Sequence, residues 1–411
     1  MANTLATPTW TLKEVSRGFY NEITFVKNIN RTYDDQYVQS GAKVGNTVNA
    51  RLPQRFTVTR GQALQLQNLF DATVPITLTD QLNIGFSYSA AQATTELNDI
   101  RNRYTQPAAE TLANACDVLA FTNVYRDVYN CIGTPGTPVS TSLDYLTAGV
   151  LLTDGSVPQE GRVAVLDPYA MAVIANQSAT LFNPSGTISE NYEKGQFGRN
   201  QLGISKWFQD PNRSVHTTGS FTSCTPTVNG ANQTGSTLNT QAWASGATTL
   251  KRGDTFTIAG VNSVNPLSFQ STGRLQRFVV TADTSDSSGN IAALPISPSI
   301  ITSGALQTVD ASPASGAAIN VWNVGTASVA LSATTSPQSM IFHPDAFAFV
   351  TADLERPSAG ATTATVRSKE FGISIRMVEQ YQIATDQNPS RLDLLIGAAT
   401  VQARLAARGA N

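Results

Sequence analysis

The stretch 219–338 constrains the fold more than any other part of the chain, because it is almost free of charge. It holds only eight charged residues. The runs TFTIAG, LQRFVVTAD, AAINVWNVG and ASVALSA alternate polar and apolar residues between turn signals, a pattern typical of half-buried strands. No helical period accompanies them. The stretch is therefore predicted to form a compact all-β module, either a small barrel or a sandwich.

The segments on either side of this module look like two halves of one α/β domain. The run RVAVLDP (162–168) predicts a buried strand, and MIFHPDAFAFVTADLERP predicts a strand, a helix capped by Pro344 and a stop before Pro357. The β-module is therefore predicted to be an insertion, whose two ends must lie close together. Further elements are expected as helices near 143–151 and 168–176 and as strands at 372–383 and 391–405.

The clearest helical pattern lies at 90–132, which is rich in Ala, Leu, Glu and Arg. Pro107 fits the first turn of a helix, where its missing N–H would be unpaired in any case. Gly133 fits the stop position, and TPGTP (134–138) follows it as a linker. We expect a long helix that ends near Gly133.

The N-terminal part predicts an arm followed by an extended loop. Residues 46–88 contain strand-like runs at 56–59 and 74–78, with possible turns at Arg60-Gly61 and Asp71-Ala72. Residues 1–45 are mixed in character and are expected to pack on something else. Their one helical stripe is short and consists of Leu12, Val15, Phe19 and Ile23.

The tripeptide Arg252-Gly253-Asp254 raises a choice between an adhesion signal and a simple turn. The residues from Thr255 to Ile258 alternate polar and apolar, and Gly260 stops the run. This pattern predicts a half-buried strand that the chain enters through a Gly-Asp turn. Three residues match by chance too easily for the motif to indicate adhesion by itself.

The composition excludes several classes of function. Charged residues are 14% of the chain and its net charge is −2, with no basic block, which argues against tight nucleic-acid binding. The three cysteines show no CxxC spacing, so a disulfide framework or a zinc site is not expected. Cys116 and Cys131 are predicted to be small core residues. The N-terminal residues include no apolar core of signal-peptide length. No run reaches the ~18 apolar residues of a membrane span. The protein is therefore expected to be made and used in a reducing cytoplasm.

No catalytic constellation is visible in the sequence. The chain has two histidines, His216 and His343, and contains no GxSxG nucleophile motif. Neither histidine has a second histidine at metal-ligand spacing. We therefore predict no enzyme activity, no metal and no cofactor. A surface of neutral polar groups is inexpensive to desolvate and suits broad subunit contacts.

The order of these segments resembles the tailed-phage major capsid proteins of the Hong Kong 97 fold. More narrowly, it is similar to the P-22-type coat family, which carries an inserted β-barrel domain. LKRGDTFTIAGV (250–261) is similar to a strand entry in that inserted domain, and DIRNRYTQPAAETLANACDV (99–118) is similar to the family's spine helix. The resemblance implies an α+β fold with an N-terminal arm at 1–45, an extended β-hairpin loop at 46–88, a peripheral domain with the spine helix at 89–139 (the helix itself at about 94–132), an axial domain with closing peripheral strands at 140–218 and 339–411, and the all-β insertion at 219–338.

The resemblance also implies a function and a set of partners. Identical subunits would form pentamers and hexamers that close into an icosahedral shell around double-stranded DNA, which they contact without sequence specificity. A precursor shell would assemble in the bacterial cytoplasm with a scaffolding protein, hold a portal protein at one vertex, and expand as DNA enters. No membrane is involved, and the final location is the virion.

The extended loop is the expected contact with a neighbouring subunit. Its arginines have no acids among them, and the alternative is an ordinary solvated hairpin. On the resemblance, they would pair with acids of the next spine helix, each exposed pair contributing about 0–1 kcal/mol. The uncharged stretch 229–248 would make its contacts through neutral hydrogen bonds or an aromatic ring. The predicted contact residues are Arg51, Arg55, Arg60, Glu96, Asp99, Glu110 and Trp243.

Two other functions remain open from the sequence. An encapsulin-like nanocompartment would share the fold but enclose an enzyme, and the inserted module argues against it. A secreted adhesin or carbohydrate-binding β-protein would use the Arg-Gly-Asp turn, but the missing signal peptide and the long helix argue against that. The capsid function is favoured over both.

Overall fold

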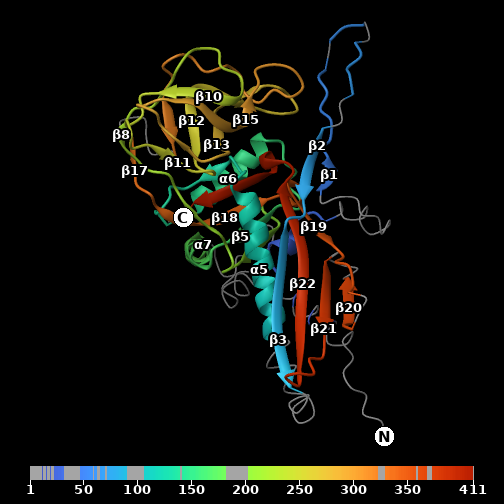
Figure 1. Ribbon diagram of the computed structural model, residues 1–411. Coiled ribbons are helices and arrows are strands. Elements are labelled where there is room, and N and C mark those ends of the chain that lie inside the picture. The colour runs from blue at the N-terminus through green and yellow to red at the C-terminus, as the bar shows by residue number, and fades with distance from the viewer. Residues whose placement is uncertain are drawn as a thin grey trace. The chain divides into compact units, whose positions relative to one another are not determined.

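The computed structural model divides the chain into two compact units, each assembled from three separate stretches (Figure 1). The first unit comprises 1–50, 73–123 and 347–399, and the second comprises 51–72, 124–346 and 400–411. The residues that the structure describes are 12, 15, 19, 23–31, 47–58, 60–62, 65–69, 72–89, 106–138, 141–181, 202–322, 329–357, 360–367 and 373–410.

The first unit is built around one antiparallel pair of long strands, β3 (Asp80–Ser89) and β22 (Gln387–Thr400). They lie side by side in Figure 1 and pair from Asp80 opposite Ile396 to Ser89 opposite Gln387. Residues 80–88 were predicted to belong to the extended loop, and this is wrong, because their partner strand comes from the far end of the chain. The remaining strands of this unit are β1 (Thr47–Arg51) paired with β2 (Thr73–Thr77), together with β19 (Phe347–Ala352), β20 (Thr362–Arg367) and β21 (Ser374–Glu379), which join β22 in the order β19-β22-β21-β20.

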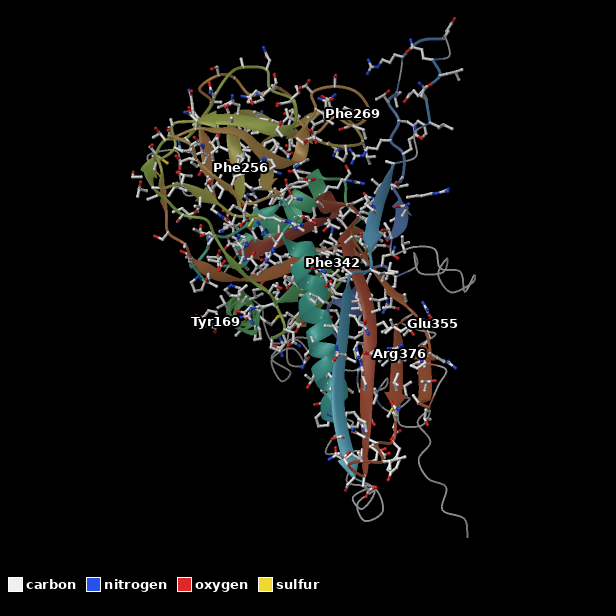
Figure 2. The ribbon with its side chains drawn as sticks, in the orientation of Figure 1. Tyr169, Phe256, Phe269, Phe342, Glu355 and Arg376 are labelled. Atoms are coloured by element: carbon white, nitrogen blue, oxygen red, sulfur yellow. The ribbon has the colours of Figure 1, made fainter. Side chains whose placement is uncertain are left out.

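A buried carboxylate in this sheet is paired with two arginines. Asp393 on β22 has no exposed side-chain surface, and Arg376 on β21 lies 2.5 Å from its Oδ2 (Figure 2). Arg391 approaches its Oδ1 at 2.6 Å. Two guanidinium groups thus offset the cost of burying one carboxylate.

The helix α5 (Gln106–Tyr125) is shorter than predicted at its C-terminal end. Pro107 is its second residue, as expected for the first turn. Gly133 does not end the helix, which stops at Tyr125. Instead it follows a short strand, with φ at +77° and no room for a Cβ beside the carbonyl of Ala410. The N-terminal part of the predicted helix, 90–105, lies outside the described residues.

The N-terminal arm packs on the core of the first unit, as its apolar stripe predicted. Leu12, Val15 and Phe19 are helical and buried. A 3₁₀ turn, η1 (Val26–Asn28), follows, and Asp117 of α5 accepts hydrogen bonds from the backbone N–H groups of Thr24, Phe25 and Val26 at 2.7–3.0 Å. This carboxylate occupies the N-terminus of the turn, where negative charge is favoured.

The second unit contains a six-stranded sheet in which the last strand of the chain takes an interior place. β23 (Ala406–Ala410) runs parallel to β4 (Cys131–Ile132) and antiparallel to β18 (Thr335–Phe342). The sheet continues through β5 (Val163–Leu166) to β6 (Lys206–Gln209), and β7 (Val215–Thr217) pairs with β18. The predicted helices are confirmed as α6 (Ser142–Asp154) and α7 (Pro168–Leu181), and η5 (Ala403–Leu405) precedes β23.

The helix predicted after Pro344 is wrong. Pro344–Ala346 form only one 3₁₀ turn, η4, and the chain then enters β19. The residues Phe347–Thr351 are aromatic, β-branched or alanine, and all five are buried. Residues that pack well on both faces of a sheet here prevail over the helix-start signal of Pro344.

The stretch 219–338 is all-β throughout its described residues, as predicted. Its main sheet has the order β16-β12-β13-β15-β10-β9, and the pairs β11-β14 and β17-β8 flank it. Phe256, labelled in Figure 2, stacks on Phe278 with ring centroids 5.6 Å apart in the buried core. The strands are β8 (Phe221–Cys224), β9 (Thr227–Val228), β10 (Gly235–Gln241), β11 (Thr249–Leu250), β12 (Thr255–Val264), β13 (Ser271–Val280), β14 (Thr284–Ser285), β15 (Ile291–Ile300), β16 (Ile319–Val321) and β17 (Val329–Leu331).

Candidate functional site

The Arg-Gly-Asp tripeptide is a turn whose aspartate points into the protein. The Asp254 side chain is fully buried. Its Oδ2 accepts hydrogen bonds from the backbone N–H groups of Gly219 and Lys251, at 3.0 and 2.8 Å. Gly253 has φ at +103°, a conformation that glycine adopts without strain. The predicted turn into β12 is confirmed.

The other oxygen of Asp254 completes a buried polar cluster. Its Oδ1 accepts from His216 Nε2 at 3.0 Å and from Trp322 Nε1 at 3.1 Å. The guanidinium of Arg408 is also fully buried and lies over the ring of Trp322, 5.1 Å from its centroid. Burial lowers the pKa of His216, and the charges of Arg408 and Arg126 lower it further, against the opposing effect of Asp254. His216 is therefore neutral at pH 7 and donates its Nε2 proton to Asp254.

This cluster is structural and offers nothing to an adhesion receptor. It brings together β7, the turn before β12, the residue after β16 and the C-terminal strand β23, all within the second unit. Of the tripeptide, only Arg252 reaches solvent, and it pairs with Asp127 at 2.8 Å. A receptor that recognises the aspartate could not reach it, so the adhesin alternative loses its only motif.

The extended loop between β1 and β2 has two limbs held together mostly by side chains. Leu52 N donates to Ala72 O at 2.8 Å, and Gln54 Nε2 donates to Asn68 O at 2.9 Å. Further out, Gln67 Oε1 accepts from Thr57 N at 3.0 Å, and Gln67 Nε2 donates to Thr57 O. Glutamine amides thus replace the backbone ladder, so the run predicted as a strand at 56–59 is not one over its described residues.

This loop exposes large apolar side chains. Phe56 is 56% exposed, Val58 93%, Leu66 87% and Leu69 80%. Soluble monomers rarely leave a contiguous apolar patch unpartnered, and such patches mark interaction sites. We call these four residues the loop patch. An ordinary solvated hairpin would not carry them.

The predicted contact residues fall into three groups. Arg51 and Arg60 are exposed and Arg55 is half-buried, and 51–69 contains no acid, so this part of the loop is basic as well as apolar. Glu110 is half-buried on α5, whereas Glu96 and Asp99 lie outside the described residues.

The prediction that Trp243, in the uncharged stretch 229–248, contacts a neighbouring subunit is corrected by its burial. Only 4% of this side chain is exposed, and its Nε1 donates to Thr240 Oγ1 at 2.8 Å. Its ring also makes an edge contact with Phe221. The indole is a core side chain with its one donor satisfied, so it is not available to a neighbouring subunit.

The loop patch is the feature that the sequence interpretation missed. Phe56 and Val58 alternate with polar residues, which predicted a strand with its apolar face buried. The signal that was available is that this run lies in a stretch, 51–69, with three arginines and no acid.

The described residues contain no group of three or more His, Cys, Asp or Glu side chains placed to bind a metal ion. Among the helices of the described residues, none is long and apolar enough to span a membrane. Cys116 and Cys131 are free and buried, as predicted for core residues, although Cys131 lies on β4 rather than in a helix.

The sequence matches the profile of one protein family, the P22 coat protein (gene protein 5), over residues 1–407. The chain belongs to the P22 coat protein family. It is a phage major capsid protein, a structural subunit of the virion that assembles into oligomeric shells. This family is a non-enzymatic class, in keeping with the expected lack of catalysis.

Solved structures of phage capsids resemble the chain at low identity. A Mycobacterium phage Che8 structure is 14% identical, with 94% of this chain and 90% of that chain covered and a TM-score of 0.45. The mature capsid of bacteriophage PhiM1 is 8% identical, with 94% and 86% covered and a TM-score of 0.41. The CUS-3 coat protein I-domain is 29% identical over 25% of this chain and 96% of its own, with a TM-score of 0.19. No curated protein matches the sequence. The assignment rests on the family match.

Proposed function

We propose that copies of this chain form pentamers and hexamers by laying the loop patch on a neighbouring subunit. The observation that carries this proposal is the exposure of Phe56, Val58, Leu66 and Leu69 in a stretch, 51–69, that contains no acid. Fully burying one such side chain contributes about 1.5–3 kcal/mol. An exposed ion pair contributes only about 0–1 kcal/mol. The apolar side chains therefore supply most of the contact energy, and Arg51, Arg55 and Arg60 select acidic surroundings such as those of Glu96, Asp99 or Glu110.

The domain organisation proposed for the assembled subunit follows the family resemblance. The stretch 219–338 acts as an inserted domain, because β7, just before it, pairs with the start of β18 at its end, with His216 opposite Ser336. The paired ends meet the requirement that an insertion leave and re-enter its host at one place. The segments 1–45, 46–88, 89–139 and 140–218 with 339–411 then serve as arm, loop, peripheral and axial parts, with β3 reassigned from the loop to the peripheral sheet.

The shell is proposed to enclose double-stranded DNA and to assemble in the bacterial cytoplasm with a scaffolding protein and a portal protein at one vertex. A net charge of −2 supports a wall that tolerates packed DNA without binding it tightly. Tight binding would need clustered Lys and Arg to displace counterions.

The test is a pair of substitutions at adjacent positions of the loop. Leu66→Asp removes an apolar side chain of the loop patch and adds a negative charge. Gln65→Asp adds the same charge beside it, at an exposed residue, and removes nothing apolar. Shell yield, measured by sedimentation and electron microscopy, should collapse for Leu66→Asp and stay near wild type for Gln65→Asp. Equal yields from the two variants would contradict the proposal.

A further inference from the structure

A cavity of about 830 Å³ in the second unit combines apolar walls with arginines. Its apolar wall includes three leucines that are unusually exposed: Leu267 at 73%, Leu275 at 42% and Leu306 at 57%. The loop also contributes Arg55 to the lining, and the segment before β23 contributes Arg404. A cavity of this size lies in the range, about 300–1,000 Å³, of sites that enclose a ligand or a few side chains.

Among the described residues that line this cavity, no acid is left to match the arginines. The one carboxylate among them, Asp154, is already paired with Arg274. Both arginines line the cavity; burial lowers the pKa of Arg404, and the charge of Arg55 lowers it further, so the two cations repel each other. Arg404 donates to Gly155 O and Gln402 Oε1, but its Nε is buried without a hydrogen-bond partner. Two like charges held together in this way favour an anion between them.

One exposed turn of the same chain has the complementary chemistry. Residues 380–387, between β21 and β22, contain no base and one acid, Asp386. Tyr381 is 52% exposed and Ile383 is 85% exposed, although both are large apolar side chains. Asp386 Oδ1 accepts a hydrogen bond from the Tyr381 hydroxyl at 2.9 Å, which holds the acid beside the apolar pair.

We propose that the cavity receives the 380–387 turn of a second copy, with Tyr381 and Ile383 against the exposed leucines and Asp386 facing Arg55 and Arg404. The proposal rests on the self-assembly proposed above and names a contact beyond the loop patch. Because the turn and the cavity are different surfaces, each subunit gives one and receives one. Contacts of this kind continue from subunit to subunit, as a ring of five or six requires.

The test is cross-linking in assembled particles of the full chain. Leu306→Cys and Ile383→Cys replace exposed side chains, and the native Cys116 and Cys131 are buried. The third native cysteine, Cys224, is only half-buried, so every variant also carries Cys224→Ser. The double variant should give a ladder of disulfide-linked oligomers on a non-reducing gel. A mixture of the two single variants should stop at dimers, and each single variant alone should stay monomeric. The pair Leu267→Cys with Ile383→Cys repeats the test from the other side of the leucine wall.

Intact shells in which neither cysteine pair cross-links would overturn this inference and leave the proposed function standing. Dimers from Ile383→Cys alone would also overturn it, because they would show that two turns meet each other. Adducts with a different protein, in particles made in cells, would assign the cavity to that occupant instead. If the wild-type chain forms no shells at all, the proposed function fails and this contact fails with it.

Discussion

His216 Nε2 lies 3.0 Å from Asp254 Oδ1, and the two side chains are 3% and 1% exposed. A carboxylate at that depth is tolerated because four donors surround it: two backbone N–H groups, the histidine and Trp322. The contact joins the strand that leads into the β-module to the turn that begins β12. The aspartate of a tripeptide associated with adhesion therefore serves here as a buried structural contact within the second unit.

Removing this carboxylate should destabilise the second unit strongly. Asp254→Ala leaves four buried donors without their acceptor, and each unsatisfied buried donor costs about 1–3 kcal/mol. The measurement is the denaturant midpoint of the unassembled subunit. Asp283→Ala is the control, because Asp283 pairs with Lys251 at the surface and should lose no more than about 1 kcal/mol. Equal losses from the two substitutions would contradict the role assigned to the cluster.

Mild acid should weaken the same cluster through His216. Its pKa in the folded chain is lowered by burial, by Arg408 and by Arg126, although Asp254 opposes this, and Tyr125 also contacts the ring. The unfolded chain therefore binds more protons than the folded chain below the ordinary histidine pKa of about 6.5. The stability supplied by neutral His216 is complete above that pH and is lost at up to about 1.4 kcal/mol per unit as the pH falls.

The pH effect is measured by denaturant unfolding of the unassembled subunit at pH 7.5 and 5.5. His216→Gln keeps a donor for Asp254 but does not titrate, so its free energy of unfolding should fall less between the two pH values than that of wild type. Identical pH slopes for the two proteins would show that His216 is not responsible.

Two glycines of the first unit should respond oppositely to alanine. A Cβ on Gly397 of β22 would come within 2.5 Å of the backbone oxygen of Thr77, whereas a Cβ on Gly85 of β3 would stay 3.9 Å from Ser390 O. Gly397→Ala should cost about 1–3 kcal/mol by overpacking. Gly85→Ala should be neutral or stabilise by up to about 1 kcal/mol, since glycine is unfavourable inside a strand. Thermal unfolding of both variants tests the closeness of β22 to the end of β2.

The loop arginines should matter less for assembly than the loop patch does. Arg51 and Arg60 are exposed, and replacing both with alanine should weaken each contact by at most about 1–2 kcal/mol. Raising the salt concentration should reduce wild-type assembly by a similar factor and leave the double variant nearly unaffected, because salt screens exposed charges. A double variant that abolishes assembly at low salt would mean that charge, rather than apolar burial, supplies the contact.

Local patterns of the sequence predicted several strands but not the partners of those strands. The alternation from Thr255 to Ile258 predicted β12, and the buried run at 163–166 predicted β5. β3 was placed in the loop because its partner, β22, is about three hundred residues away, and no local pattern indicates a pairing of that separation. The helix after Pro344 failed for a related reason, since burial on both faces of a sheet outweighs a start signal.

The contact surface was only half visible in the sequence. The absence of acids near Arg51, Arg55 and Arg60 can be read directly from the sequence. The exposure of Leu66 and Leu69 cannot, because it depends on the two limbs of the loop being joined by glutamine side chains instead of by a backbone β-ladder. The prediction for Trp243 was wrong in the opposite sense, because this side chain is buried rather than exposed. Its indole N–H donates to Thr240, three residues earlier, so the ring can be part of the core.

The measurement that tests self-assembly most directly is electron microscopy of the high-mass fraction of the expressed chain, with and without the scaffolding protein proposed as its partner. Closed shells, or sheets of pentamers and hexamers, are the predicted result, and the comparison shows whether scaffolding is needed to close them. A chain that stays monomeric under both conditions would contradict the assignment of the loop patch to assembly.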